Sequence, residues 1–484
     1  MDCCCELGIV LIREMSTGNK TVVIKLPKKA KLPIRINLFK PHKSSQFLTR
    51  SDAISLGEKH QSAVPLNSLN SLNTRDSDIV LKIFKDSQIG RLERLNSERV
   101  SRMKHSPFRF FRGLPALMLY DLAWSNQTGL IQQICGDAHL MNFRGFASQE
   151  RTLLFGVNDF DETLIAPFEW DIKRLATSIC IAMEGLGGSD LQSQEAVYAM
   201  ISDYVDYFDQ SKDLGPIEQH YRFFRGRDFL NNVSDPEVLK QKIALARKQL
   251  KKDAQSLVPR ISKPDSSGGN KFFDDGSGMW RPEVGEPFYG DQSAFFKNYR
   301  QSLSFEIKKI FDRYRLSDVI MRVVGVGSVG TRTAIALFED PNQEDPLILQ
   351  MKEAEPPLLE GLYSRAIKHQ GKRVVIGKKW LQSSSDIFLG WATDPKDKRP
   401  YYVRQLRNMK IKADEEKMTI PFLTEYSKNA GTALADAHVR SGNASILFGY
   451  IKNKDLFAET VYQFANAYAK RNEKDYSYFC KAIQ

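Results

Sequence analysis

The chain has 484 residues, of which 42% are hydrophobic and 11% aromatic, and it carries a formal net charge of +12. This length allows two or three domains with a substantial core, and no stretch approaches the roughly 20 apolar residues that cross a bilayer. Six cysteines, poorly spaced, argue against a disulfide scaffold, and no secretory signal is recognisable. These features predict a cytoplasmic protein without a membrane span.

The first 88 residues read as a basic and polar N-terminal extension that is partly flexible. Thr21–Pro41 is rich in Lys and Arg and has the pattern of one or two edge strands. Ser51–Ser77 is rich in Ser and Asn, which predicts a mobile linker. The excess positive charge favours anionic partners in general. Binding to nucleic acid is one such option, but it rests on charge alone.

Residues 89–312 are expected to form a helical lobe. A helical pattern starts near Ile89 and ends at Ser106-Pro107, because the residue before proline avoids helical dihedrals. A Phe-rich turn at Arg109–Gly113 follows. Short strands at Leu130–Ile134 and Thr152–Val157 flank a polar motif. Three helices and a loop are predicted in the remainder of this lobe: Trp170–Met183, Gln194–Phe208, Pro236–Leu250 and the loop Val258–Pro287.

Residues 313–410 are expected to form an antiparallel β lobe, and residues 411–484 a set of C-terminal helices. The helix Pro421–Arg440 is the clearest of the latter. The β lobe contains five strand candidates: Ile320–Val326, Thr331–Phe338, Leu347–Met351, Ile387–Thr393 and Tyr401–Leu406.

The first motif that carries chemistry is Cys-Gly-Asp-Ala-His-Leu-Met-Asn at Cys135–Asn142. Phosphoryl transfer needs a carboxylate that orients the attacking hydroxyl, together with oxygen ligands for Mg²⁺. Asp137 and Asn142 have the aspartate-four-residues-asparagine spacing of a kinase catalytic loop, which predicts a base and a metal ligand. A second metal carboxylate is expected at Asp159 or Asp161. Asp159 is preferred because the apolar run Leu153–Val157 leads into Asp-Phe.

The second motif is Gly-Val-Gly-Ser-Val-Gly at Gly325–Gly330. Gly325, Gly327 and Gly330 would let a hairpin backbone approach phosphates, and Ser328 of the same loop is included in the predicted nucleotide site. A dinucleotide fingerprint should open a helix, whereas a strand is predicted to follow here. The next strand ends at Lys352, which matches a lysine that holds nucleotide phosphates.

The two motifs occur in the reverse of the order expected for a kinase, in which the glycine loop and lysine precede the catalytic aspartate. The sequence therefore predicts an α+β, protein-kinase-like, two-lobed fold that is circularly permuted. The lobe with the catalytic loop comes first and the β lobe with the glycine loop comes later.

The first motif resembles the His-Gly-Asp-x-His-x-x-Asn signature of aminoglycoside and choline kinases, with Cys135 in place of the first histidine. By this resemblance His139 would contact the transferring phosphate, and Asp171 would brace the catalytic loop through backbone hydrogen bonds. The helix Pro421–Arg440 resembles the helix that precedes the catalytic loop in those enzymes, which agrees with permutation.

More closely, the chain from about Arg94 onward resembles a bacterial family catalogued as domain of unknown function twenty-two fifty-two, which is placed among kinase-like folds. The resemblance rests on these segments: Ser106–Gly113, Gly136–Asn142, Asn158–Thr163, Gly325–Thr331, Gln350–Ala354, Tyr402–Lys410 and Ala433–Gly442. It also implies a glutamate within Arg373–Gly377 as the partner of Lys352, where this chain has Ile376. Glu360 is then the nearest candidate, with Glu353 and Glu355 as alternatives.

The sequence predicts an ATP- and Mg²⁺-dependent phosphotransferase that acts on an unknown hydroxyl acceptor, a small molecule rather than a protein. A nucleotide-binding pseudokinase that serves as a scaffold, and a nucleotidyl transferase, are the alternatives. Arg109 and Arg112, upstream of the catalytic loop, would bind an acidic group or form a structural salt bridge.

Overall fold

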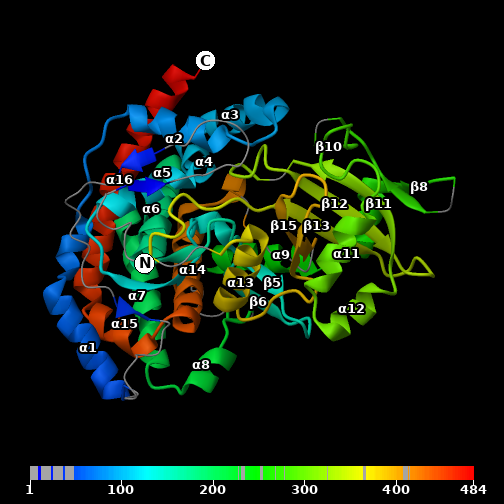
Figure 1. The fold of residues 1–484 in the computed structure, drawn as a ribbon. Helices are drawn as coiled ribbons and strands as arrows, with labels where there is room; N and C mark the ends of the chain where they lie inside the picture. The colour runs from blue at the N-terminus through cyan, green and yellow to red at the C-terminus, as the bar shows by residue number, and fades with distance from the viewer. Residues whose placement is uncertain are drawn as a thin grey trace.

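The structure is a computed structural model that combines a helical lobe with a β lobe, so the α+β class is confirmed (Figure 1). It describes residues 9–11, 23–25, 36–38, 48–226, 228–229, 235–250, 254–266, 269–276, 278–323, 325–363, 367–406, 413 and 415–483. Tyr402–Lys410, one of the segments of the resemblance, lies partly outside these ranges.

The β lobe is built on one antiparallel six-stranded sheet in the order β10-β11-β12-β13-β15-β14. Its strands are β10 (Met279–Trp280), β11 (Arg315–Arg322), β12 (Thr333–Glu339), β13 (Leu347–Glu353), β14 (Gly390–Thr393) and β15 (Pro400–Gln405). All seven residues of β12 and of β13 are buried, because helices cover both faces of the sheet. The five strands predicted for this lobe are confirmed, with ends that shift by a few residues.

Each face of the sheet has its own apolar cluster. On one face the aromatic side chains of α11 (Ser293–Gln301) and α12 (Phe305–Phe311) pack against β11–β13. On the other face Leu257 and Val258 of α10 (Ala254–Ile261) cover Ile320, Ile335 and Ile348. The prediction of a loop at Val258–Pro287 is therefore wrong. This range contains part of α10 and the strands β8 (Ser262–Pro264), β9 (Asn270–Phe272) and β10.

The helical lobe is centred on α6 (Glu169–Gly185), which is buried on nearly all sides. Around it lie α7 (Asp190–Ser211), α14 (Ile420–Ser441) and α16 (Lys454–Ala482). Its charged residues Asp171, Lys173 and Arg174 are buried along with its apolar ones. The smaller helices of this side of the molecule are α8 (Pro216–Tyr221), α9 (Pro236–Leu250) and α15 (Ala444–Ile451).

The N-terminal part of the chain contributes to the helical lobe rather than forming a mobile linker. Residues Arg50–Ala63 form α1, whose Gly57 lies so close to α15 that an added Cβ would come within 2.1 Å of the Ile446 carbonyl oxygen. The 3₁₀ helix η1 (Leu66–Asn70) buries Leu66 and Leu69. Polar composition concealed this role, because close helix contact here needs a small residue rather than a large apolar face.

The segments around residues 9–41 are described only in part: β1 (Ile9–Leu11) pairs with β2 (Val23–Lys25), and β3 (Ile36–Asn37) joins β4. The helix predicted to begin near Ile89 begins later, at η2 (Glu93–Leu95) and α3 (Asn96–Lys104), because Ile89 itself follows the end of α2 (Asp78–Gln88). The predicted turn Arg109–Gly113 lies instead within the helix α4 (Pro107–Gly113). The Ser106 hydroxyl accepts the Arg109 N–H, and Pro107 occupies the first helical turn.

Two strand pairs flank the first motif, and one short helix lies within it. β4 (Leu130–Ile134) pairs with β7 (Leu164–Pro167), and β5 (Phe143–Ala147) pairs with β6 (Leu153–Val157). The 3₁₀ helix η3 (Leu140–Asn142) lies between β4 and β5. The remaining helices are α5 (Pro115–Trp124), α13 (Gln370–Leu381) and η4 (Glu415–Lys417). None of the described helices has the length and apolar character that a membrane span requires.

Candidate active site

The loop between β4 and η3 is held by α6 in the way expected for Asp171. The backbone N–H groups of Cys135 and Gly136 donate to its two carboxylate oxygens over 2.7 and 2.9 Å. Gly136 has φ of +80°, and a Cβ there would lie 2.1 Å from the Glu162 carbonyl oxygen, so glycine is required. The loop is therefore fixed in one shape by a buried carboxylate and by contact with the next motif.

Asp137 lies at the centre of this loop and forms an ion pair with Arg174. The Arg174 guanidinium lies 2.8 Å from Asp137 Oδ1 and also donates to the Phe111 carbonyl oxygen. Burial raises the pKa of Asp137 to about 6, even though Arg174 acts in the opposite direction. A carboxyl group with this pKa can exchange protons near neutral pH, as a general base must.

His139 and Asn142 pack against Asp137. The Met141 N–H donates to His139 Nδ1 over 3.1 Å, and His139 Nε2 lies 3.8 Å from Asp137 Oδ2. The Asn142 amide donates to the Asp137 carbonyl oxygen over 2.7 Å, which orients its own oxygen as the atom available to a metal. The phosphate contact expected for His139 stays a prediction.

The carboxylate turn, residues 158–163, gives its two aspartates different partners. Asp161 forms an ion pair with Lys352 and accepts the Tyr402 hydroxyl over 2.8 Å. Asp159 has no such short contact with either group. Burial alone would raise the pKa of Asp159, but Lys352, Arg404 and Arg144 outweigh it and lower the pKa to about 2. Asp159 is thus a permanently charged carboxylate, and Asp161 is the partner of the lysine.

The glycine turn connects β11 to β12 as expected for a hairpin. Gly325 and Gly330 have φ of +56° and +89°, and a Cβ on Gly327 would lie 3.1 Å from the Arg112 carbonyl oxygen. The turn is clamped from outside by the segment before α3. The Leu92 N–H donates to the Gly330 carbonyl oxygen over 2.8 Å, and Arg91 donates to Val329.

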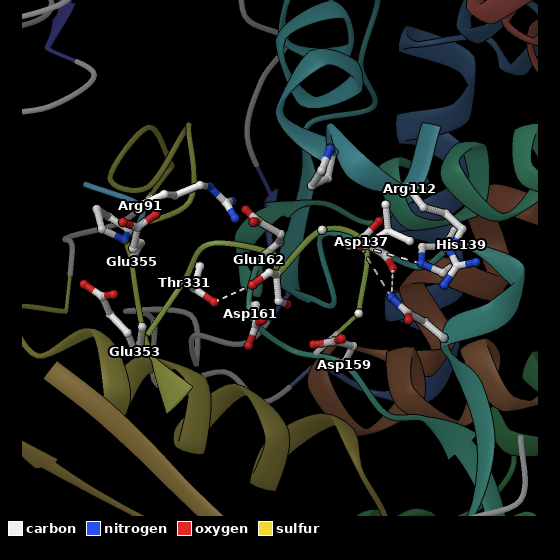
Figure 2. Close-up of a pocket in the computed structure, with 18 of the residues that line it drawn as sticks. Arg91, Arg112, Asp137, His139, Asp159, Asp161, Glu162, Thr331, Glu353 and Glu355 are labelled. Carbon is white, nitrogen blue, oxygen red and sulfur yellow. Dashed lines mark hydrogen bonds and ion pairs between the residues drawn. The ribbon is translucent and has the colours of Figure 1, made fainter. Parts of the chain in front are cut away.

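Both motifs open onto one pocket with a volume of about 130 Å³ (Figure 2). Its lining includes Arg112 of α4 and residues of the Cys135–Asn142 loop, the carboxylate turn and the glycine turn with the residue after it: Asp137, His139, Asn142, Asp159, Asp161, Gly325, Gly327, Ser328 and Thr331. Gly330 and Lys352 are buried and are not among the residues that line this pocket. Segments nearly 200 residues apart in the sequence therefore share a cavity.

None of the glutamates considered as a partner of Lys352 forms that pair. Glu360 accepts the Gln370 amide over 2.7 Å, and Glu353 pairs with Arg399 over 2.6 Å and with Arg332. Lys352 pairs with Asp161 instead. Burial would lower the pKa of Lys352, but Asp161 first, then Tyr402 and Asp159, raise it above its ordinary value. Local spacing could not reveal this, because the partner lies 191 positions earlier in the chain.

Sequence reasoning missed several charged residues around the pocket. Arg174 pairs with Asp137, Arg373 of α13 donates to the carboxylate turn, and Arg91 and Glu162 line the pocket. Burial and the nearby Asp137 raise the pKa of Glu162 to about 7. Only Arg174 had a signal in the sequence, since it lies three residues after Asp171 on the same predicted helix.

Arg109 and Arg112 form the structural salt bridges that were one of their two expected roles, although not with a motif carboxylate. Arg112 lies 2.8 Å from Glu415 Oε2, and Arg109 lies 3.7 Å from Glu415 and from Glu416. Arg112 also lines the pocket, so it retains a face toward any ligand there.

Oxygen donors suited to Mg²⁺ are present, although no ready-made metal cage is found. Among the described residues no group of three or more His, Cys, Asp or Glu side chains has a metal-binding arrangement. Asp159 and Asn142 offer one carboxylate and one amide oxygen at the pocket. Such a set fits Mg²⁺, which keeps several waters and takes further oxygens from phosphates.

A family profile described as an uncharacterised protein conserved in bacteria, DUF2252, matches residues 91–482. The chain belongs to the DUF2252 family. Searches of curated proteins and of solved structures found no match. The DUF2252 region includes both motifs, the β lobe and α14–α16, and it leaves out α1, η1 and α2. Membership confirms the family resemblance.

Proposed function

We propose that this DUF2252 protein is an ATP- and Mg²⁺-dependent phosphotransferase acting on a small hydroxyl compound. The observation that carries the proposal is the shared pocket, which Asp137, Asn142 and Asp159 line together with residues of the glycine turn. A base, two oxygen ligands, a glycine turn and a buried lysine are together the parts that phosphoryl transfer requires.

Each of these residues has a defined task. The Asp137 carboxylate accepts the hydrogen bond of the acceptor hydroxyl and takes its proton as the acceptor oxygen bonds to the γ-phosphorus of ATP. The bond from that phosphorus to the bridging oxygen breaks at the same time, and ADP leaves. Asn142 and Asp159 would hold Mg²⁺, which neutralises phosphate charge when bound. Lys352 would supply an ammonium group to the phosphates, and its ion pair with Asp161, which lines the pocket, keeps that group charged and in place. The backbone of Gly325–Gly330 covers the phosphates.

We also propose a circularly permuted kinase-like fold. In support, the end of α14 lies beside the strand that leads into the catalytic loop. The Ser441 hydroxyl donates to the Gln133 carbonyl oxygen over 2.9 Å, and an added Cβ on Gly442 would collide with Gln132. His438 Nε2 also lies 3.3 Å from Asp171 Oδ2. These contacts support the view that α14 corresponds to the helix that precedes the catalytic loop in aminoglycoside and choline kinases, although α14 follows Asp137 by about 300 residues in this chain.

A second cavity, of about 520 Å³, is a candidate for the acceptor site. It borders the catalytic loop through Leu140 and Met141 and has Phe108 and Met418 in its apolar wall. The ion pairs of Glu415 with Arg109 and Arg112 form a wall common to both cavities, since Arg109 lines this one and Arg112 lines the other. A concave cavity of this size favours a small molecule over a protein acceptor.

A thermal shift measurement with ATP and Mg²⁺ tests the nucleotide site. Wild-type protein should be stabilised, and Lys352→Ala and Asp159→Asn should lose most of that shift. If all three proteins respond alike, the nucleotide assignment is wrong.

The second candidate function is a nucleotide-binding pseudokinase. Among the described residues no glutamate pairs with Lys352, and this favours the pseudokinase. Slow ATP consumption that is lost in Asp137→Ala would support the enzyme. Nucleotide binding without any consumption, in wild type and variant alike, would support the scaffold. Analysis of the products distinguishes nucleotidyl transfer from phosphoryl transfer, since the first releases pyrophosphate and the second releases ADP.

A further inference from the structure

Arg373 of α13 occupies the part of the helix from which a glutamate would be expected to reach the lysine. It is buried, with 3% of its surface exposed. Its guanidinium donates to three backbone carbonyl oxygens: that of Thr163 over 2.5 Å, of Asp161 over 2.7 Å and of Glu355 over 2.9 Å. Its Nε donates to Gln370 on the same helix.

These bonds join three pieces of the proposed site. Asp161 and Thr163 belong to the carboxylate turn, and Glu355 follows Lys352 at the end of β13. Helix α13 packs against β15 and, through Gly377, against Thr163, where an added Cβ would lie 2.4 Å away. Arg373 thus ties the turn and the end of the lysine strand to one rigid helix.

An arginine has no acceptor atom for the lysine ammonium, whereas a glutamate has two oxygens. Arg373 binds carbonyl oxygens instead, and Lys352 pairs with Asp161. Asp161 is anchored by Arg373 through its carbonyl and by Tyr402 through its carboxylate. It is therefore positioned to serve as the lysine's counter-ion.

We propose that Arg373 is a positioning residue that replaces the lysine–glutamate bridge of the site. It fixes the carboxylate turn so that Asp161 holds Lys352 and Asp159 alone supplies the metal carboxylate. This inference rests on the proposed function, which it deepens by dividing the two aspartates between a lysine and a metal. Arg373 itself touches neither nucleotide nor metal.

Two variants test this role with a matched control. Arg373→Gln removes the charge, and Arg373→Lys keeps it but cannot span three carbonyl groups from one planar fork. Arg75→Lys is the control, since Arg75 is also a buried arginine with ion-pair partners, Asp121 and Asp475, that do not line the pocket. It reports what the loss of a buried guanidinium costs in general.

The first readout is amide hydrogen exchange of the ligand-free protein. Residues 157–163 and 353–358 should exchange faster in both Arg373 variants, while α7 stays protected. Equal exchange of these two segments in wild type and variants would overturn the inference, whatever the protein binds.

The second readout is the affinity of Mn²⁺ for the ATP complex, followed by electron paramagnetic resonance. Both Arg373 variants should bind Mn²⁺ roughly 10- to 100-fold more weakly, as is usual when the support of a metal ligand is removed. Arg75→Lys should bind it as wild type does. Unchanged Mn²⁺ affinity in the Arg373 variants would contradict the inference. Failure of the wild type to bind ATP would instead contradict the proposed function, with the exchange result still deciding the role of Arg373 in the turn.

Discussion

The environment of Asp137 is the clearest feature at the scale of single residues. Its carboxylate is mostly buried and is held by the guanidinium of Arg174, and the loss of solvent raises its pKa to about 6. A general base must be deprotonated, so kcat/KM should rise as the pH increases through about 6. The Asp137→Asn variant should lose about 100- to 10,000-fold in turnover while nucleotide affinity is kept. A variant with wild-type turnover would remove Asp137 from the mechanism.

Arg174 gives a second prediction, which concerns the midpoint of the same pH profile. Its positive charge lowers the pKa of Asp137 against the effect of burial. Arg174→Met should therefore move the midpoint of kcat/KM to higher pH, and Arg174→Lys should move it less because the charge remains. If both variants keep the wild-type midpoint, the observed ionisation belongs to another group.

Glu162 makes stability depend on pH in a direction unusual for a carboxylate. Its pKa in the folded protein is about 7, raised by burial and by Asp137 from an ordinary value of 4.5. A raised pKa means that the folded state binds more protons, so the contribution is present below pH 4.5 and is lost as the pH rises to about 7. Urea unfolding of Glu162→Gln should show a smaller decrease of stability over this range. Glu98→Gln, an exposed change on α3, should follow wild type.

At the scale of elements, the glycine turn depends on left-handed backbone at Gly330. Alanine at φ of +89° is strained by about 1–2 kcal/mol, and its Cβ would lie 3.0 Å from that of Arg91. Gly330→Ala should thus reduce both the free energy of unfolding and nucleotide affinity. Gly185→Ala, which has open space around it at the end of α6, is the matched control and should be close to neutral. Equal effects of the two changes would argue against a special role for the turn.

The elements also mark how far sequence could predict the structure. Regular alternation and length identified β11, β12, β13 and α14, since these features depend on local patterning. The loop predicted at Val258–Pro287 was wrong because α10 is stabilised by contact with the distant residues Ile320 and Ile348. In the same way α1 depends on close contact with α15, which the Ser-rich composition did not indicate.

The candidate site shows the same division between local and distant information. Spacing and turn chemistry predicted that Asp137, Asn142, Asp159 and the glycine turn would belong together, and these residues do line one pocket. The partner of Lys352 and the roles of Arg174 and Arg373 depend on contacts between segments that the chain separates widely. No spacing rule reports such contacts.

At the scale of the whole molecule, the segment before α2 meets the C-terminal helix α16 in the helical lobe. Arg75, between η1 and α2, forms buried ion pairs with Asp121 of α5 and Asp475 of α16. Arg75→Met leaves both carboxylates without this partner, and a broken buried pair typically costs about 3–5 kcal/mol. Urea unfolding should reveal that loss. Arg50→Met, which breaks an exposed pair with Asp213, should cost less than about 1 kcal/mol. Equal stability of the two variants would mean that the Arg75 ion pairs do not stabilise the packing of residues 50–75 on the helical lobe.

The central claim is that Asp159 in the first half of the chain and Lys352 in the second bind the same nucleotide. A double-mutant cycle on ATP–Mg²⁺ affinity, measured by calorimetry with Asp159→Asn, Lys352→Met and the double variant, tests it most directly. One shared site predicts that each change weakens binding and that the two losses are non-additive by about 0.5–3 kcal/mol. Losses that simply add, or an affinity that neither change alters, would place the two residues in separate sites and contradict this account.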